Sequence, residues 1–141
     1  VGKTHIATAL AYEACRKGFK VKFYTAAGLI NELLAAQQEY KLNRLEKQFS
    51  AYHLVVIDEL GYVPFSKTGA ELLFQFCSSR HERGSVIITT NLEFPKWTEV
   101  FLDEQMTAAL LDRLTHKAHI LNINGESYRF KQALAKQQSS D

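Results

Sequence analysis

Cysteine and proline are scarce in this sequence, and long apolar runs are absent. The chain of 141 residues has two prolines and two cysteines, Cys15 and Cys77. The cysteines are far apart and match no metal-binding or redox spacing, so we expect buried free thiols in a reducing compartment. No apolar run approaches the roughly 20 residues of a membrane span, and no signal peptide is visible. We therefore expect a cytoplasmic protein.

Neither sign of charge dominates the composition. Seventeen Lys and Arg residues against 15 Asp and Glu residues give a formal net charge of +2. This balance permits contact with nucleic acid but does not argue for it. The chain is 46% hydrophobic and 23% charged, which is ordinary for a globular protein. Its length is sufficient for one domain with a real hydrophobic core.

The chain begins with a short phosphate-binding signature. Gly2, Lys3 and Thr4 run directly into a helical pattern, as do the last three positions of the motif G-x-x-x-x-G-K-[ST]. Open N–H groups and the helix dipole attract phosphate at such a helix start. The lysine of the motif would reach the β- and γ-phosphates of a nucleotide, and the threonine hydroxyl would bind Mg²⁺. The tripeptide alone fits an exposed N-terminal segment equally well, so this interpretation depends on a partner motif downstream.

Helical and extended patterns alternate along the chain. Apolar residues at helical spacing predict helices, and short β-branched runs predict strands. Helices are predicted over 4–16, from 26 into a more polar stretch ending near 48, and over 68–83, 106–116 and 127–136. Strands are predicted over 20–24, 54–59 and 85–90, with a loosely alternating run at 117–123 as a last strand. Pro95 and Trp97 fall in a predicted loop or short turn, and residues 137–141 in a frayed tail. The alternation predicts an α/β fold with a parallel sheet and helices on both faces.

Two acids follow the most apolar predicted strand. Asp58 and Glu59 end the run that begins at Leu54, and ligands of open α/β sheets bind at this carboxyl edge. A fixed carboxylate suits a magnesium ion, because this hard cation prefers oxygen ligands. A second acid can position or deprotonate a water that attacks the γ-phosphate. Asp58 fits the first role and Glu59 the second; the alternative is that both are solvated at a strand end. Asn91 ends the next strand, where it could hold that water or serve as an ordinary turn residue.

These motifs together carry a family resemblance. The sequence is similar to the IstB/DnaC group of AAA+ ATPases, and most similar to IstB-like proteins, the ATP-binding helpers of insertion-sequence transposition. The resemblance covers nearly the whole chain, and its motifs fall in the family order. They are Gly-Lys-Thr-His at 2–5, Val-Val-Ile-Asp-Glu-Leu-Gly-Tyr at 55–62, Thr-Thr-Asn at 89–91, Leu-Leu-Asp-Arg-Leu at 110–114 and Ser-Tyr-Arg at 127–129.

The resemblance implies a fold, cofactors and a site. It implies a P-loop NTPase of the AAA+ class over residues 1–136, a three-layer α/β fold whose first strand and most of whose phosphate loop are missing. ATP and Mg²⁺ are the implied cofactors. Gly2, Lys3 and Thr4 correspond to Walker A, Asp58 and Glu59 to Walker B, and Asn91 to sensor I. The same resemblance makes Arg113 the arginine finger that reaches the ATP of a neighbouring subunit in a homo-oligomer; without it, Asp112 and Arg113 would pass for a surface ion pair. Arg129 has a nucleotide-sensing or interface role, or is a solvated arginine at a helix end.

The partners are also implied by resemblance. In this ATPase group, helices inserted after the second strand line the path of DNA, and here that stretch is about 26–48. Tyr40, Lys41, Arg44 and Lys47 would place an aromatic ring and three cations near one another along a helix. Contact would be mainly to phosphates, and an ordinary solvated helix face fits these residues equally well. The transposase of the same element is the second implied partner. His116 and His119 have no further ligand beside them, so we expect no zinc site there.

Two alternatives remain open at the level of function. A DnaC-like loader of a replicative helicase has the same motifs, although His5 and the run Asp-Glu-Leu-Gly-Tyr at 58–62 favour the IstB-like assignment. A non-catalytic DNA-binding or interaction fragment is the other alternative. In the family strand order 5-1-4-3-2 the missing strand is central, so the strands at 85–90 and 117–123 would face a gap. We therefore expect this chain alone to fold poorly and to bind ATP weakly.

Overall fold

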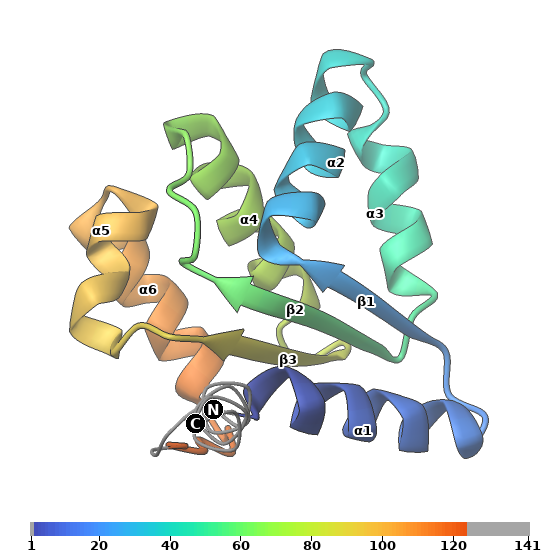
Figure 1. Ribbon diagram of the computed structural model, residues 1–141. Coiled ribbons are helices and arrows are strands. Elements are labelled where there is room, and N and C mark those ends of the chain that lie inside the picture. Colours follow the sequence, from blue (N-terminus) through green and yellow to red (C-terminus); the bar gives the residue numbers. More distant parts are fainter. Residues whose placement is uncertain (1, 124–141) are drawn as a thin grey trace, which may run out of the picture.

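Three parallel strands form the sheet of the protein (Figure 1). The computed structural model describes residues 2–123. Strands β1 (Val21–Thr25), β2 (Leu54–Leu60) and β3 (Ser85–Thr90) lie in the order β1-β2-β3. Val21 pairs with Leu54, and Leu54 with Ser85, so the carboxyl ends of all three strands reach the same edge. This order matches the 4-3-2 part of the family order, and β1 and β3 are the edge strands among the described residues.

Helices cover both faces of this sheet. One face carries α1 (Lys3–Arg16), whereas α2 (Ala26–Gln38), α3 (Leu42–Ser50) and α4 (Lys67–Arg80) lie over the other (Figure 1). A 3₁₀ turn (Phe94–Lys96), α5 (Trp97–Phe101) and α6 (Glu104–Thr115) follow β3. In residues 2–123 no helix combines the length and apolar character needed to cross a membrane. The prediction of an α/β fold with a parallel sheet is confirmed.

The central strand β2 explains why both faces must be covered. Its side chains alternate between the faces, and every residue from Leu54 to Asp58 is buried. Val55 and Ile57 belong to the larger core cluster, which includes side chains of α2, α3, α4, α5 and α6. Leu54 and Val56 belong to a smaller cluster beneath α1. A continuous apolar run is therefore the pattern that a strand buried on both sides requires.

Small residues on α1 face the sheet. Ala7 and Ala11 are buried against Leu54 and Val56, whereas Ile6 and Leu10, the larger residues of the predicted helical pattern, are 38% and 50% exposed. Ala7 and Ala11 lie one position further around the helix, and their small side chains allow α1 to approach the sheet closely. The apolar pattern correctly predicted the helix but did not indicate which side of it is buried.

The predicted start of α2 and end of α1 agree with the structure, and a capping residue is present at each. The Thr25 hydroxyl accepts a hydrogen bond from the Gly28 amide at 3.1 Å, which caps α2 as expected. Gly18 follows α1 with a φ of 90°, a left-handed conformation that ends the helix. The helix predicted to reach residue 83 ends earlier, at Arg80. The Arg80 guanidinium lies close to Gly84, where an added Cβ would come within 2.3 Å of it.

Arg80 holds the amino-terminal edge of the sheet together. Its buried guanidinium donates to the backbone carbonyls of Phe49 at 2.9 Å, Tyr52 at 3.0 Å and Ser85 at 3.1 Å. Burial lowers the pKa of Arg80 from its ordinary value. These three hydrogen bonds join the end of α3, the approach to β2 and the start of β3. The strands thereby start in register, and their carboxyl ends are aligned at the opposite edge.

Three sequence predictions need correction. Residues 117–123 form no strand; Ile120 and Leu121 are 59% and 68% exposed, and the run has no strand partner among residues 2–123. The region of Pro95 and Trp97 is helical, and Trp97, the first residue of α5, is buried. Cys15 is exposed, because the last turn of α1 projects past the amino end of β2 (Figure 1). The predicted helix at 127–136, which contains Arg129, and the predicted tail lie outside the described residues.

The two thiols should differ sharply in reactivity. Cys77 is buried, and burial raises the pKa of its thiol to about 12, whereas Cys15 is exposed. We expect iodoacetamide at pH 8 to modify one thiol per native chain and two per chain in denaturant, as counted by mass spectrometry. Cys15→Ser should abolish native labelling. Rapid native labelling of Cys77 would contradict this placement of α4.

Candidate nucleotide-binding site

The first turn of α1 meets the end of β2 at the carboxyl edge of the sheet. The Thr4 hydroxyl lies 3.0 Å from Oδ1 and 3.1 Å from Oδ2 of Asp58, to which it donates. These two residues are separated by 53 others in the sequence. The contact unites the two motifs on which the sequence interpretation depends, and it places an anion-attracting helix start beside a fixed carboxylate.

The Asp58 carboxylate is a suitable ligand for a divalent cation. Asp58 is only 3% exposed, and no Lys, Arg or His of residues 2–123 forms an ion pair with it. Its side-chain hydrogen-bond partners in residues 2–123 are the hydroxyl groups of Thr4 and Thr89. A buried carboxylate is costly without a positive partner, and oxygen ligands at a helix start fit Mg²⁺. Thr4 and Asp58 are therefore the residues that would hold the metal.

Gly2 and Lys3 lie where the sequence predicts phosphate contacts. Gly2 precedes α1 with a φ of 69°, a conformation that suits glycine. Its carbonyl accepts the first hydrogen bond of the helix, from the Ile6 amide at 3.0 Å. The first amides of α1 have no partner within the helix, so they are available to an anion. Lys3 is partly exposed at this end.

β2 contains an irregularity at its two acids. Ile57 pairs with Ile88 and Leu60 pairs with Thr90, so Asp58 and Glu59 together lie opposite one residue of β3. This is a β-bulge, which leaves one residue unpaired and redirects the side chains near it. Glu59 has a φ of 62°, uncommon for a residue other than glycine. The bulge allows Asp58 to stay buried while the next side chain, that of Glu59, is exposed.

The loop after the bulge is closely packed. Gly61 has a φ of 88°, and an added Cβ would lie 2.3 Å from the Leu92 side chain. No residue with a Cβ would fit there without displacing Leu92. Glu59 itself lines a small hollow of about 90 Å³ together with Thr25, Ala27, Tyr62, Val63 and Phe65. The acid that would position an attacking water therefore faces an open space at the carboxyl edge.

Thr89 connects the two acids through one hydroxyl group. The Thr89 Oγ1 atom donates to Asp58 Oδ1 and accepts from the Glu59 amide at 2.9 Å. Thr89 is 8% exposed. The Thr-Thr-Asn motif at 89–91 predicted a role only for its asparagine. The available signal was a hydroxyl residue near the end of an otherwise aliphatic strand, beside an acid pair on the neighbouring strand.

Asn91 lies near this edge without joining the described hydrogen bonds. It follows β3 directly and is exposed. Within residues 2–123 its side chain forms no hydrogen bond with Thr4, Asp58 or Glu59. Its position leaves it free to contact a bound group, and its sensor role remains a prediction.

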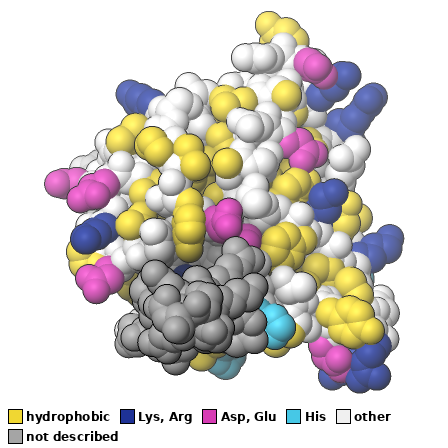
Figure 2. Space-filling model, in the orientation of Figure 1, with side chains coloured by type: hydrophobic (Ala, Val, Ile, Leu, Met, Phe, Trp, Pro, Cys, Tyr) yellow, Lys and Arg dark blue, Asp and Glu magenta, His cyan; other side chains and the backbone are white. Residues whose placement is uncertain are grey.

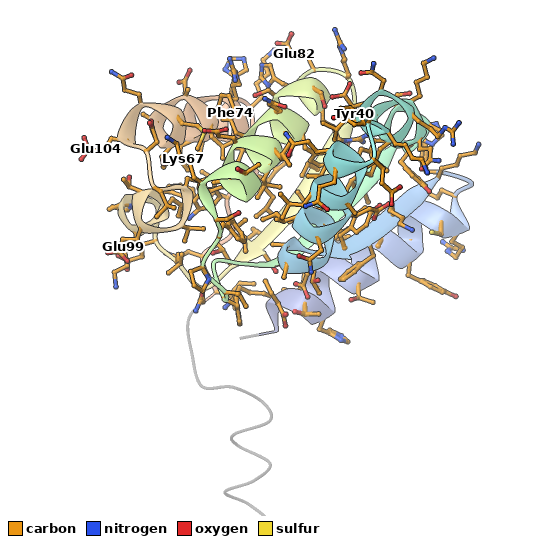
Figure 3. All side chains as sticks on the ribbon, turned by 90° about the horizontal axis from the view of Figure 1, so that it is seen from above. Tyr40, Lys67, Phe74, Glu82, Glu99 and Glu104 are labelled. Atoms are coloured by element: carbon orange, nitrogen blue, oxygen red, sulfur yellow. The ribbon has the colours of Figure 1, made fainter. Side chains whose placement is uncertain are left out.

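The Arg113 side chain contacts residues of α4. Its Nη1 donates to the Ser78 hydroxyl at 2.6 Å, and its guanidinium lies 5.2 Å from the centre of the Phe74 ring. Phe74 is labelled on α4, next to α6, in Figure 3. The exposed guanidinium does not take part in the Thr4–Asp58 site of its own chain. The surface ion pair with Asp112 is not found among the described residues.

The predicted DNA-contacting residues lie around the turn between α2 and α3. Tyr40 is 97% exposed at this turn (Figure 3), and Lys41 pairs with Glu39 at 3.1 Å. Arg44 and Lys47 project from α3, whose Leu45 and Phe49 are buried. Tyr40 and Lys41 thus belong to the turn and not, as expected, to one helix with the other two. Lys and Arg side chains are visible along the α3 side of the molecule in Figure 2.

A hollow is also found between these two helices. Its volume is about 220 Å³, and its lining includes Glu32, Glu39, Lys41 and Arg44. Both signs of charge are present there, so the hollow is no simple anion site. Among residues 2–123 no group of three or more His, Cys, Asp and Glu side chains could hold a metal ion.

The fold and the Thr4–Asp58 contact define a class of protein, the P-loop NTPase fold of the AAA+ type. A model of the family described as IstB-like ATP binding protein matches residues 1–136. The chain belongs to this family.

Several curated relatives are similar over most of the chain. It is 42% identical to the insertion sequence IS21 ATP-binding protein of Pseudomonas aeruginosa over 132 residues, 94% of this chain and 50% of the relative. It is 39% identical to the insertion sequence IS232 ATP-binding protein of Bacillus thuringiensis subsp. berliner, over 97% of this chain and 55% of the relative. The chain thus spans about half the length of the curated relatives it matches.

Solved structures support the same fold. DnaA from Aquifex aeolicus, in its AMPPCP-bound form, is 16% identical, with a TM-score of 0.72 over 99% of this chain and 42% of that chain. The DnaC helicase loader is 26% identical, with a TM-score of 0.58 over 81% of this chain and 63% of that chain. The first likeness concerns the fold alone. The AAA+ fold predicted from the motifs is confirmed.

Proposed function

We propose that residues 1–136 form the ATPase core of a DNA transposition helper that binds and hydrolyses Mg-ATP. The observation that carries this proposal is the contact between Thr4 and Asp58, which brings the phosphate-binding signature to the acid of the buried strand. Family membership supports nucleotide binding. We propose Mg²⁺ binding and ATP hydrolysis from the geometry of the site.

The binding residues have distinct tasks in this proposal. Backbone amides at the start of α1, after Gly2, bind phosphate oxygens, and Lys3 reaches the β- and γ-phosphates. The Thr4 hydroxyl donates a hydrogen bond to Asp58, so a lone pair of its oxygen would be available to ligate Mg²⁺. Asp58 holds the ion directly or through a water. When bound, Mg²⁺ neutralises charge that develops on the β- and γ-phosphates.

Glu59 and Asn91 act on the attacking water. Glu59 is the next residue after the metal ligand, and the bulge exposes its carboxylate at the carboxyl edge. It orients or deprotonates the water, whereas Asn91 positions that water or contacts the γ-phosphate. Arg113 serves the site of a neighbouring subunit, where a guanidinium stabilises transition-state charge. Its contacts with Ser78 and Phe74, and not with Thr4 or Asp58, support a role between subunits of a homo-oligomer.

DNA and a transposase are the proposed partners. The names of the relatives connect them to insertion sequences, so we propose that ATP-dependent assembly on DNA directs a transposase to its target. Lys41, Arg44 and Lys47 contact phosphates, and the exposed Tyr40 ring can stack on a base. The likeness to the DnaC helicase loader supports a second candidate, a helicase-loading role with the same nucleotide chemistry.

Replacing the proposed catalytic acid should separate binding from turnover. In a form of the protein extended upstream of Val1 to complete the phosphate-binding loop, Glu59→Gln should lower kcat by roughly 10²- to 10⁴-fold. Its affinity for ATP should stay near that of the parent, because the amide cannot take a proton but preserves the shape. Phosphate release gives kcat, and a fluorescent ATP analogue gives Kd.

Glu82→Gln is a matched control for that experiment. Glu82 is also an exposed glutamate with positive φ, 61°, but it precedes β3 at the opposite edge of the sheet (Figure 3). This variant should hydrolyse ATP at the parent rate. Unchanged turnover in Glu59→Gln, or equal loss in both variants, would remove Glu59 from its proposed role.

The DNA proposal predicts a change in salt dependence. Replacing Lys41, Arg44 and Lys47 with Ala should weaken binding to mixed-sequence duplex DNA and reduce the slope of log K against log salt by about 2–3. The control variant replaces Arg16, Lys17 and Lys20 with Ala. These residues are exposed at the end of α1 and just after it, and their replacement removes the same amount of positive charge. Fluorescence anisotropy of labelled DNA measures the affinity of each variant over a range of salt concentrations. Equal losses in the two variants would indicate a general charge effect and no DNA site at α3.

A further inference from the structure

We infer that Thr89 is a positioning residue that holds the bulge of β2 and thereby aims Glu59. The inference rests on the proposed roles of Asp58 and Glu59. Thr89 lies opposite the bulge, between the pairs Ile57–Ile88 and Leu60–Thr90. Its hydroxyl is the one group of β3 that contacts both acids of β2 in the described residues.

At the bulge, the Thr89 hydroxyl accepts a hydrogen bond from a backbone amide of β2. In a regular parallel ladder, a backbone carbonyl of β3 would accept the amide proton of each alternate β2 residue. At the bulge the register shifts, and the Glu59 amide donates to the Thr89 side chain instead, at 2.9 Å. A buried amide without an acceptor is unfavourable. The side chain of Thr89 therefore replaces a missing ladder acceptor and makes the irregular register stable.

The same hydroxyl also orients the metal-binding carboxylate. A threonine hydroxyl has one proton and two lone pairs. Because it accepts from the Glu59 amide, its own proton is free for Asp58 Oδ1, to which it donates. Thr4 donates to the carboxylate from the side of α1. Asp58 is thus fixed from both sides, and the direction of the Glu59 amide is linked to the orientation of the Asp58 carboxylate.

The hydrogen bond from the Glu59 amide to Thr89 also fixes the position of the Glu59 side chain. A slip of one residue in strand register sends each following side chain to the opposite face. The bond from Thr89 opposes that slip and keeps Glu59 at its φ of 62°, with its side chain at the carboxyl edge. The neighbouring Thr90 hydroxyl donates to the Leu60 carbonyl at 2.7 Å, which fixes the residue after the bulge. Thr89 is the member of this pair that contacts the acids.

Valine and serine substitutions separate the hydroxyl from the shape of the side chain. In the extended form of the protein, Thr89→Val should lower kcat by roughly 10- to 100-fold, the range typical of groups that orient metal ligands, with KM changed by less than about threefold. Thr89→Ser retains the hydroxyl and should restore most of the turnover. Thr107→Val is the control: Thr107 is 2% exposed in α6, and its hydroxyl donates to the Asp103 carbonyl at 2.6 Å. This control should keep the parent kcat.

Amide hydrogen exchange supplies a readout that is independent of turnover. By NMR, the Glu59 amide should be protected in the parent and should exchange at least about tenfold faster in Thr89→Val, while those of Val55 and Ile57 keep their protection. If Thr89→Val does not fold, the parent and Thr89→Ser still test the bond, because both must protect the Glu59 amide.

The outcomes distinguish this inference from the proposed function. An unprotected Glu59 amide in the parent, or full turnover in Thr89→Val, would overturn the role of Thr89. If Glu59→Gln retains full turnover, the proposed function fails, whereas the exchange experiment still decides whether Thr89 holds the bulge. Loss of kcat in Thr89→Val with no rescue by serine would assign the effect to packing and would also overturn the inference.

Discussion

The burial of the Asp58 carboxylate is the constraint on which the rest of the site depends. It is 3% exposed and lies at the end of a strand covered on both faces, with hydroxyl donors and no ion pair in residues 2–123. Such a group requires either a cation or a complete set of donors. Thr4 brings the start of α1 to it, and Thr89 brings β3. The contact of α1 with β2, the contact of β3 with β2 at Thr89 and the proposed metal site therefore all involve one buried charge.

Packing far from the site keeps these groups in place. Ala7 and Ala11 allow α1 to lie close to β2, which brings Thr4 within hydrogen-bonding distance of Asp58. At the other edge, the Arg80 guanidinium joins three backbone segments and sets the strand register. The bulge then shifts that register once, between Ile57 and Leu60. A regular sheet with a single local irregularity can bury one acid and expose the next.

The sequence was sufficient to predict the three strands of the sheet and the two motifs that meet at Thr4 and Asp58, because their signals are local. The β-branched run of β2, the capping residue Thr25 and the motif around Thr4 each depend on a few neighbouring residues. The errors concern tertiary partners. Residues 117–123 alternate but have no strand to pair with in the described part, and the exposure of Cys15 depends on how far α1 extends past the sheet. The role of Thr89 required the bulge, which no period-2 pattern reveals.

The most direct test of the account is the magnesium dependence of nucleotide binding. A fluorescent ATP analogue should be titrated against the extended protein and its Asp58→Asn variant, with Mg²⁺ and with EDTA. We predict that Mg²⁺ raises the affinity of the parent, and that Asp58→Asn loses this increase while its affinity in EDTA stays the same. An equal response to Mg²⁺ in both proteins would contradict the claim that Asp58 holds the metal at the start of α1.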